Sequence, residues 1–431
     1  VYQVPDFLRS LYGYYKHRTD FHKYLIGVTY RNEPAPLTSD DIRRLNNGVI
    51  QTSVSGIEAY NSCPYAFFLE RALRVQERDV QKMEPTDIGD LFHETLEEIV
   101  KRIWMENETI NQVPIDRLLN LVDDIVRHYA DKIQRDYFNK RAINKFLLER
   151  IKESLKSSIR TLHYQSQYSK YRTIMVEEPF GPNATKLKTK PISLPNGFTL
   201  YLTGIIDRVD ESVDGNKHYI SVIDYKSSRH IIDLDKVLNR LSLQLFTYLD
   251  VVVDNLASIY KDGEVIPSGV LYYQIQNPTI NAQKELTEEE ILKEHYAKYQ
   301  MKGLTLEEKQ VSMLFDEKLA KERESDIINV KFTKKGDYYS YSDVINKAEM
   351  DALRKFTRES IEEAALKYSN GEIPITPIKS NNFRQCQYCP YLAICKFDAR
   401  LRENKYKELK KYKKETGIIN LIEQVRQGDE S

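Results

Sequence analysis

The chain has 431 residues, which is enough for two or three ordinary domains with sizeable cores. Hydrophobic residues make up 41% of it, which indicates a globular protein, and no run approaches the ~18 apolar residues of a membrane span. Lys+Arg and Asp+Glu both number 64, so the net charge of zero argues against a uniformly basic protein that coats nucleic acid. A basic channel around an acidic metal site remains compatible with this balance.

The first 50 residues have a mixed, partly helical pattern that ends in a polar break, Asn46-Asn47-Gly48. Because the chain begins with Val1 rather than Met, we expect a piece of a longer chain and interpret residues 1–50 as the remnant of a preceding region. A helix is predicted to start near Ser55, which would be its N-cap, with Glu58 completing a capping box. Apolar residues at helical spacing then predict an amphipathic helix over 86–104 and further helix over 116–170.

Strand-like segments follow at 198–210 and 219–226, and the turn sequence Val213-Asp214-Gly215-Asn216 between them predicts a β-hairpin. A helix is expected over 234–254 and another strand over 268–275.

The remainder is predicted to be mostly helical. Residues 284–325 are highly charged and are interpreted as a solvated helical elaboration, and residues 343–370 as a further helix. A cysteine-rich turn at 386–395 precedes a basic helical tail over 401–431. The chain lacks the G-x-x-x-x-G-K-[ST] loop of ATPases, so we expect no ATPase site in it.

A carboxylate and a lysine end the second strand of the predicted hairpin. Asp224 and Lys226 are two residues apart, so their side chains share one face of the strand, and Asp207 lies on the partner strand. Two carboxylates form a hard-oxygen site suited to Mg²⁺, and the ammonium group could orient an attacking water or stabilise charge on phosphorus. The alternative is an exposed hairpin with an Asp–Lys pair, because D-x-K is common by chance.

Two helical patterns accompany the hairpin. Gly89, His93 and Glu97 recur every fourth residue, so they share a helix face on which His93 could bind a metal. Gln244 and Tyr248 similarly share a face that suits DNA phosphate and sugar contacts. Considered singly, a structural histidine and ordinary helix packing are the alternatives.

The order of these motifs resembles the RecB-type branch of the PD-(D/E)xK nucleases. The matching sequence is G-x-x-x-H-x-x-x-E, G-x-x-D, D-x-K and Q-x-x-x-Y over roughly residues 51–400. The resemblance implies an α/β, restriction-endonuclease-like fold, a mixed sheet flanked by helices, that hydrolyses DNA phosphodiesters with a metal ion. It makes Lys226 the catalytic lysine, and the implied metal ligands are His93, Asp207, Asp224 and the backbone carbonyl of Tyr225.

All four cysteines can belong to one metal site. Cys386, Cys389 and Cys395 cluster near the C-terminus, and Cys63 stands alone far before them. Spacing alone leaves zinc, an iron–sulfur cluster and free thiols open. One cysteine before the RecB-type core and three after it form an arrangement that resembles the iron–sulfur nucleases, and this resemblance implies a [4Fe–4S] cluster. The cluster would be a structural staple that closes a very long loop.

Three segments resemble the AddB family of helicase–nuclease subunits: residues 60–68, 270–273 and 299–304. This resemblance implies a cytoplasmic protein that resects double-strand breaks, acts on single-stranded DNA ends and forms a heterodimer with an AddA-type helicase–nuclease subunit. A free-standing CRISPR-associated type of exonuclease and a non-catalytic DNA-binding or assembly module are the alternatives. The intact Asp207, Asp224 and Lys226 count against the non-catalytic module.

The segment 396–414 carries nine Lys/Arg against three acidic residues. Such a run could follow a DNA backbone, although a solvated helix face has the same composition.

Overall fold

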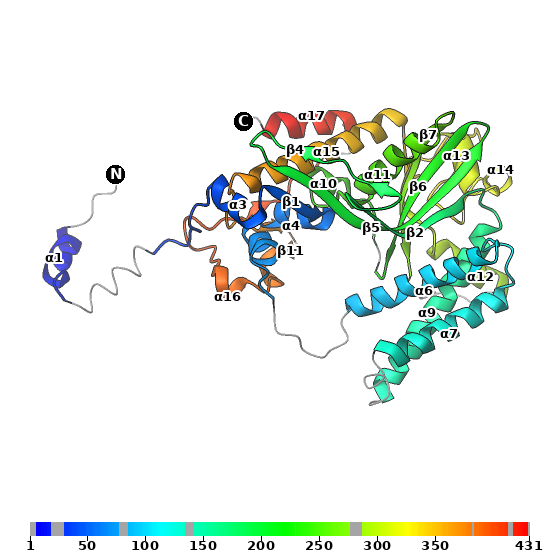
Figure 1. Ribbon diagram of the computed structural model, residues 1–431, viewed down its shortest axis with the longest axis horizontal. Helices are drawn as coiled ribbons and strands as arrows, with labels where there is room; N and C mark the ends of the chain where they lie inside the picture. The colour runs from blue at the N-terminus through cyan, green and yellow to red at the C-terminus, as the bar shows by residue number, and fades with distance from the viewer. Residues whose placement is uncertain are drawn as a thin grey trace.

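A central mixed β-sheet organises the molecule (Figure 1). The computed structural model describes residues 6–18, 30–76, 85–133, 142–228, 230–275, 287–381, 383–412 and 417–429. The sheet has the order β3-β2-β5-β6-β7-β8-β9, with β1 and β4 also paired to β5. Its strands are β1 (Val49–Ser53), β2 (Arg172–Gly181), β3 (Leu187–Lys188), β4 (Ile192–Ser193), β5 (Thr199–Asp214), β6 (Lys217–Lys226), β7 (Glu264–Gln274), β8 (Lys302–Leu306) and β9 (Val344–Ile345).

Helices cover both faces of this sheet, which confirms the predicted mixed sheet flanked by helices. In Figure 1, α15 and α17 lie on one side of the sheet and α6, α7 and α9 on the other. The longer helices are α1 (Asp6–Tyr15), α3 (Ser39–Asn46), α4 (Val54–Ser62), α6 (Pro85–Met105), α7 (Ile115–Ile133), α9 (Ala142–Ser166), α11 (Gln244–Ile259), α12 (Glu288–Lys298), α15 (Lys347–Ser369) and α17 (Ile418–Asp429). None of the described helices is long and apolar enough to cross a bilayer.

The remaining helical elements are short. They are α5 (Pro64–Phe67), the π-helix η1 (Phe68–Ala72), α10 (Leu234–Leu238), α13 (Lys309–Phe315), α14 (Leu319–Glu322), the 3₁₀-helix η2 (Gln385–Gln387) and α16 (Leu392–Cys395). A second, three-stranded sheet has the order β11-β10-β12, formed by β10 (Ile378–Ser380), β11 (Phe383–Arg384) and β12 (Lys407–Glu408).

The predicted hairpin is present as β5 and β6, which pair antiparallel from Arg208↔Ile223 to Asp214↔Lys217. Gly215 in the two-residue turn has φ +62°, a left-handed conformation that glycine adopts without steric cost. Alternate residues of β6 point into opposite cores. Ile220 and Val222 pack with the α11–α15 side, whereas Tyr219 and Ile223 pack with the α6–α9 side. This alternation places Asp224 and Lys226 on the α11 side.

The helix start near residue 55 differs from the prediction. Ser53, not Ser55, is the N-cap of α4, because its backbone is extended and its hydroxyl accepts a hydrogen bond from the Gly56 amide at 3.1 Å. Glu58 therefore forms no capping box with this helix. Its carboxylate instead accepts hydrogen bonds from the backbone amides of Leu243 and Gln244, 185 and 186 residues further along the chain.

The single helix predicted over 234–254 is wrong, because the chain forms two helices, α10 and α11, with a break between them. Arg240 in the break has φ +62°, which a right-handed helix cannot contain. The Asn239 side chain donates to the Asp235 carbonyl at 2.7 Å and so ends α10.

The interpretation of 284–325 as a solvated helical elaboration is also wrong. Its described part contains β8, which pairs antiparallel with β7 inside the main sheet. A Cβ on Gly303 would lie 2.1 Å from the Val270 carbonyl oxygen, so glycine permits this close pairing. The strand has only five residues between charged helices, which obscured its pattern.

Both ends of the chain contribute to the folded body. Ile42 of α3 and Ile50 of β1 are buried in the same core as α11, so packing onto the sheet starts before residue 51. The origin of residues 1–50 in a preceding region stays a prediction. The tail over 401–431 is only partly helical: residues 407–408 form β12, whereas α17 buries Leu421 and Ile422. Residues 413–416 and 430–431 lie outside the described residues.

Candidate active site

Three ligand-bearing side chains from three different elements meet at one end of the hairpin. Their ligand atoms, from His93 of α6, Glu177 of β2 and Asp207 of β5, all lie within 4.8 Å of one another. His93 Nδ1 is 2.8 Å from Glu177 Oε1 and 3.6 Å from Asp207 Oδ2. Strands β2 and β5 are neighbours, and their register at Val176↔Arg208 and Glu178↔Ile206 sets Glu177 opposite Asp207.

Asp224 and Lys226 lie on the next strand. Lys226 Nζ is 2.5 Å from Asp224 Oδ2, so the two side chains share a face as their spacing predicts. Asp224 is 2% exposed, and its Oδ2 accepts no hydrogen bond of acceptable geometry from the described residues. The Tyr225 amide donates to Asp207 Oδ2 at 2.7 Å, which ties the carboxylate of β5 to the backbone of β6.

The site concentrates negative charge in a poorly solvated place. Burial, together with the charge of the neighbouring Asp224 carboxylate, raises the pKa of Asp207 to about 7. Burial also raises the pKa of Asp224, against the lowering effect of Lys226. Burial lowers the pKa of His93, but the hydrogen bond to Glu177 and the charge of Asp207 outweigh it and bring the pKa to about 9. Without another cation, protons offset the excess negative charge.

This donor set fits a divalent cation. Carboxylate oxygens suit Mg²⁺, and an imidazole adds a ligand that many divalent ions accept. A cation would also replace the protons that the raised pKa values imply. The site thus has the composition and the charge deficit of a metal centre.

The structure brings most of the predicted site residues together, namely His93, Asp207, Asp224, Tyr225 and Lys226. Glu97 is separate, because its carboxylate forms an ion pair with Lys101 one turn along the same helix.

Glu177 was missed by the sequence motifs. It belongs to the sequence Glu177-Glu178-Pro179, two acidic residues on the strand before the hairpin, and that was the only available signal. Its φ is +42°, an unfavourable conformation for a residue with a Cβ. Such backbone strain is concentrated at functional sites. The strained residue is the one that holds the imidazole.

Gln244 and Tyr248 lie beside the carboxylates at the start of α11. Gln244 Nε2 donates to Tyr248 Oη at 2.9 Å, and the Tyr248 ring packs edge-on against Phe180. Burial raises the pKa of Tyr248, and the charges of Asp224 and Asp207 add to the effect. Glu58 accepts hydrogen bonds from the first amides of this helix, so it fixes the position from which Gln244 projects. The predicted DNA contacts of Gln244 and Tyr248 stay a prediction.

All four cysteines line one small cavity. Cys63 lies between α4 and α5, Cys386 in η2, Cys389 after it and Cys395 at the end of α16. In the described part of the chain, only His93, Glu177 and Asp207 form a group of three or more possible ligands within 4.8 Å.

Comparison with known proteins agrees with this geometry. Residues 51–396 match the PD-(D/E)XK nuclease superfamily, and the chain belongs to that superfamily. Its relatives include an ATP-dependent helicase/deoxyribonuclease subunit of Bacillus mycoides, 33% identical over 426 residues. The proteins of the same name from Bacillus anthracis and Bacillus cereus strain B4264 are 33% and 32% identical. Each alignment covers 97% of this chain but 36% of the relative, so the chain spans about a third of these proteins. The similarity to AddB-type subunits that the sequence motifs predicted is confirmed.

Proposed function

We propose that this chain is a magnesium-dependent deoxyribonuclease that cuts single-stranded DNA within a helicase–nuclease complex. The convergence of His93, Glu177 and Asp207 beside the Asp224–Lys226 pair carries the proposal. Membership of the PD-(D/E)XK superfamily and the deoxyribonuclease names of the relatives support it.

His93, Asp207, Asp224 and the Tyr225 carbonyl would hold the ion, and Glu177 would orient the imidazole through the 2.8 Å contact. Bound Mg²⁺ would acidify a water and offset charge on the scissile phosphate. The ammonium group of Lys226 would orient the attacking water or stabilise the charge that develops on the phosphate. Because Asp207, Asp224 and Lys226 are all retained, the alternative of a non-catalytic DNA-binding or assembly module is disfavoured.

The four cysteines would hold a [4Fe–4S] cluster. All four cysteines line one cavity, which supports a single shared metal site, and the 1+3 arrangement of cysteines around a RecB-type core is the reason for proposing a cluster rather than zinc. The cluster would join the end of α4 to the segment around α16. Its proposed role is structural.

The complex would also contain an AddA-type helicase–nuclease subunit. The relatives are named as one subunit of an ATP-dependent helicase/deoxyribonuclease, which implies a partner that supplies unwound DNA. Resection of double-strand breaks in the cytoplasm is the corresponding role. Co-purification with that partner separates this proposal from a free-standing exonuclease.

The test of substrate and mechanism compares Lys226→Gln with Lys217→Gln, an exposed lysine on the same strand. End-labelled single-stranded DNA, duplex DNA and RNA of one sequence are incubated with Mg²⁺. We expect the parent chain to cut single-stranded DNA, Lys226→Gln to be slower by roughly 100-fold or more, and Lys217→Gln to match the parent. Equal rates for Lys226→Gln and the parent, or equal cutting of RNA, would contradict the proposal.

A further inference from the structure

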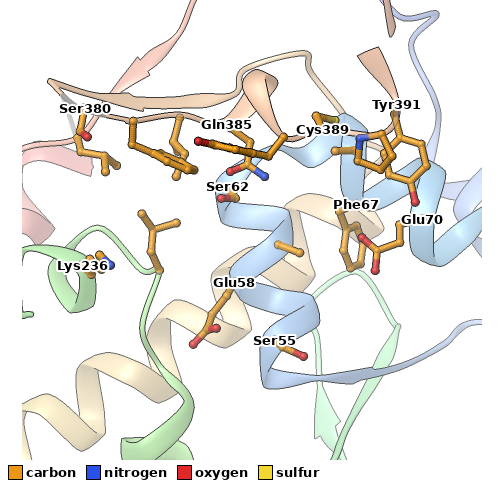
Figure 2. A pocket seen from close by; sticks show the side chains of 18 residues that line it. Ser55, Glu58, Ser62, Phe67, Glu70, Lys236, Ser380, Gln385, Cys389 and Tyr391 are labelled. Atoms are coloured by element: carbon orange, nitrogen blue, oxygen red, sulfur yellow. The ribbon is translucent and has the colours of Figure 1, made fainter. Parts of the chain in front are cut away.

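A pocket of about 600 Å³ lies between α4, α10 and the cysteine-rich end of the molecule, and we call it the flanking pocket. Figure 2 shows Glu58 and Ser62 along α4, with Gln385 and Ser380 on the opposite wall and Lys236 on a third side. Its size lies within the ~300–1,000 Å³ of typical ligand sites. Its walls combine polar side chains with aromatic rings.

The flanking pocket borders the candidate active site at Glu58. This residue lines the pocket, and its carboxylate accepts hydrogen bonds from Leu243 and Gln244 at 2.6 and 3.1 Å. Lys226 and Asp224 are close enough that their charges affect the pKa of Glu58. A strand bound in the pocket would therefore lie near the catalytic groups.

Two aromatic rings of the pocket wall face solvent, and we call them the ring pair. Phe383 is 37% exposed and Tyr388 is 80% exposed. Their planes differ by 13° and their centroids are 6.3 Å apart. Exposed aromatic side chains of this kind are stacking platforms for unpaired bases, because every base presents a π-face.

Positive charge lies in and beside the flanking pocket. Lys236 lines the pocket and Arg384 is exposed beside Phe383, and no ion pair joins either one to the described part of the chain. The segment 405–411 carries four exposed lysines and passes along the wall, where Leu409 lines the pocket.

The basic segment is fixed to α10. The Lys410 amide donates to Asn239 at 3.1 Å, and the Tyr412 amide donates to Asp235 at 2.9 Å. The acidic groups of the pocket have partners already: Arg71 lies 3.0 Å from Glu70, and two backbone amides bind Glu58. Lys236 is therefore a cation of the pocket that no ion pair within the described residues occupies, and a phosphate could bind it.

We propose that the flanking pocket binds single-stranded DNA next to the scissile phosphate, with bases stacked on Phe383 and Tyr388 and phosphates directed to Lys236 and the 405–411 segment. This inference rests on the proposed deoxyribonuclease function and adds the substrate path. Paired bases cannot stack on the rings, so the pocket selects unpaired DNA. A docked protein segment is the alternative occupant, but the ring pair and lysines together match a polyanion with flat bases.

The test measures binding of a short 2-aminopurine-labelled oligonucleotide in EDTA, so that no cutting occurs. We expect stacking to quench the fluorescence of the parent complex. Tyr388→Leu and Phe383→Leu should each weaken binding roughly 5- to 150-fold and reduce the quench. Lys236→Gln should lower the slope of log affinity against log salt by about 0.7.

Tyr341→Leu is the matched control, because Tyr341 is an exposed tyrosine that also stacks on a neighbour, Tyr339. It should bind and quench like the parent. The proposal would be overturned if both ring variants bound the oligonucleotide and quenched its fluorescence like the parent. It would also be overturned if the ring variants lost binding of a protein partner while their DNA binding stayed unchanged. Parent cutting with Mg²⁺ is measured in parallel. If the parent cuts DNA and the ring variants bind it normally, only the assignment of the flanking pocket is wrong. If the parent neither binds nor cuts DNA, the proposed function is wrong as well.

Discussion

Asp207 interacts with the other charged groups of the site. It lies 3.6 Å from His93 and accepts the Tyr225 amide at 2.7 Å. Burial and the nearby Asp224 raise its pKa to about 7, while the pKa of His93 rises to about 9. A buried cluster of this kind holds protons that a metal ion must displace.

Metal binding should therefore strengthen as the pH rises. A divalent ion binds the ionised carboxylate and the neutral imidazole, so protons compete with it below the pKa values of about 7 and about 9. We expect affinity for Mn²⁺ to rise by up to roughly tenfold per pH unit for each proton released. Calorimetry in two buffers of different ionisation enthalpy measures both the affinity and the released protons. Affinity independent of pH, with no proton release, would contradict this picture.

Glu58 should act on stability and on the placement of Gln244. Its carboxylate binds the Leu243 and Gln244 amides at the start of α11, as an N-cap side chain does. Glu58→Ala should lower the free energy of unfolding by about 0.5–2 kcal/mol and slow DNA cutting, and Glu58→Gln should do less. Urea unfolding of these variants beside Glu423→Ala, an exposed residue of α17, measures the difference. Equal loss in Glu423→Ala would rule out a capping role.

Local spacing was sufficient to predict the pairing of Asp224 with Lys226, because strand geometry alone puts residues i and i+2 on one face. It was not sufficient for Glu177 or Glu58. Glu177 reaches His93 through the packing of β2 against α6, and Glu58 reaches Gln244 across 186 residues. No spacing rule within one element encodes such contacts.

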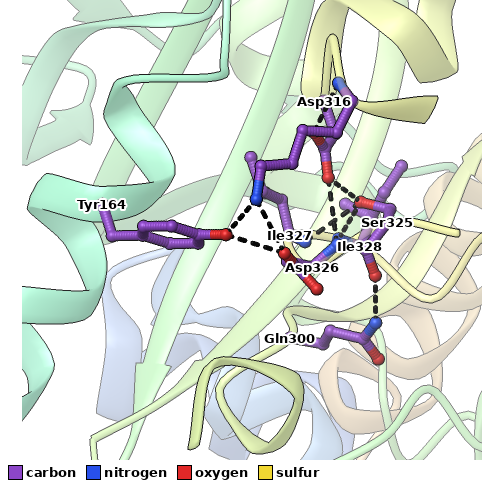
Figure 3. Close-up of polar contacts among 8 residues, drawn as sticks. Tyr164, Gln300, Asp316, Ser325, Asp326, Ile327 and Ile328 are labelled. Atoms are coloured by element: carbon purple, nitrogen blue, oxygen red, sulfur yellow. Dashed lines mark hydrogen bonds and ion pairs between the residues drawn. The ribbon is translucent and has the colours of Figure 1, made fainter. Parts of the chain in front are cut away.

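At the scale of elements, the segment after β8 is stabilised by one buried carboxylate. Asp316 is fully buried, and it accepts hydrogen bonds from the Ser325 hydroxyl at 2.7 Å and the Lys318 and Asp326 amides at 3.0 Å (Figure 3). Figure 3 also shows Tyr164 of α9 hydrogen-bonded to Asp326. These hydrogen bonds connect helix α9 to the segment that follows α13.

Removal of that carboxylate should destabilise the protein. Asp316→Ala leaves three donors without their acceptor, one of them buried and two partly buried, so we expect the free energy of unfolding to fall by about 2–3 kcal/mol. Asp337→Ala, which removes an exposed carboxylate from the same region, should change it by less than about 0.5 kcal/mol. Thermal and urea unfolding measure both. The same stability in both variants would show that the network is incidental.

The β5–β6 hairpin and the amphipathic α6 were predictable because period and turn residues agree over long stretches. The five residues of β8 were not, since pairing with β7 and the absence of a side chain at Gly303 define that strand. The break between α10 and α11 likewise depends on the left-handed Arg240, which has no sequence signature of its own.

At the scale of the whole molecule, Cys63 and the C-terminal cysteines belong to segments that are distant in the chain but line one cavity. Cys63→Ser should remove the visible absorbance of the proposed cluster and lower the free energy of unfolding by roughly 2–5 kcal/mol, as for the loss of a native cross-link. Ser62→Ala, at the neighbouring residue, should keep both. Metal analysis that finds zinc and no iron would contradict the cluster.

If the carboxylates of the β5–β6 hairpin hold the catalytic metal ion, DNA cutting should depend on Asp224. End-labelled single-stranded DNA is incubated with Mg²⁺ and the parent chain, Asp224→Ala or Asp262→Ala, an exposed residue in the turn before β7. We expect the parent and Asp262→Ala to cut at the same rate, and Asp224→Ala to lose cutting while keeping its fold and cysteine-bound metal. Undiminished cutting by Asp224→Ala would place the catalytic site elsewhere and contradict the account.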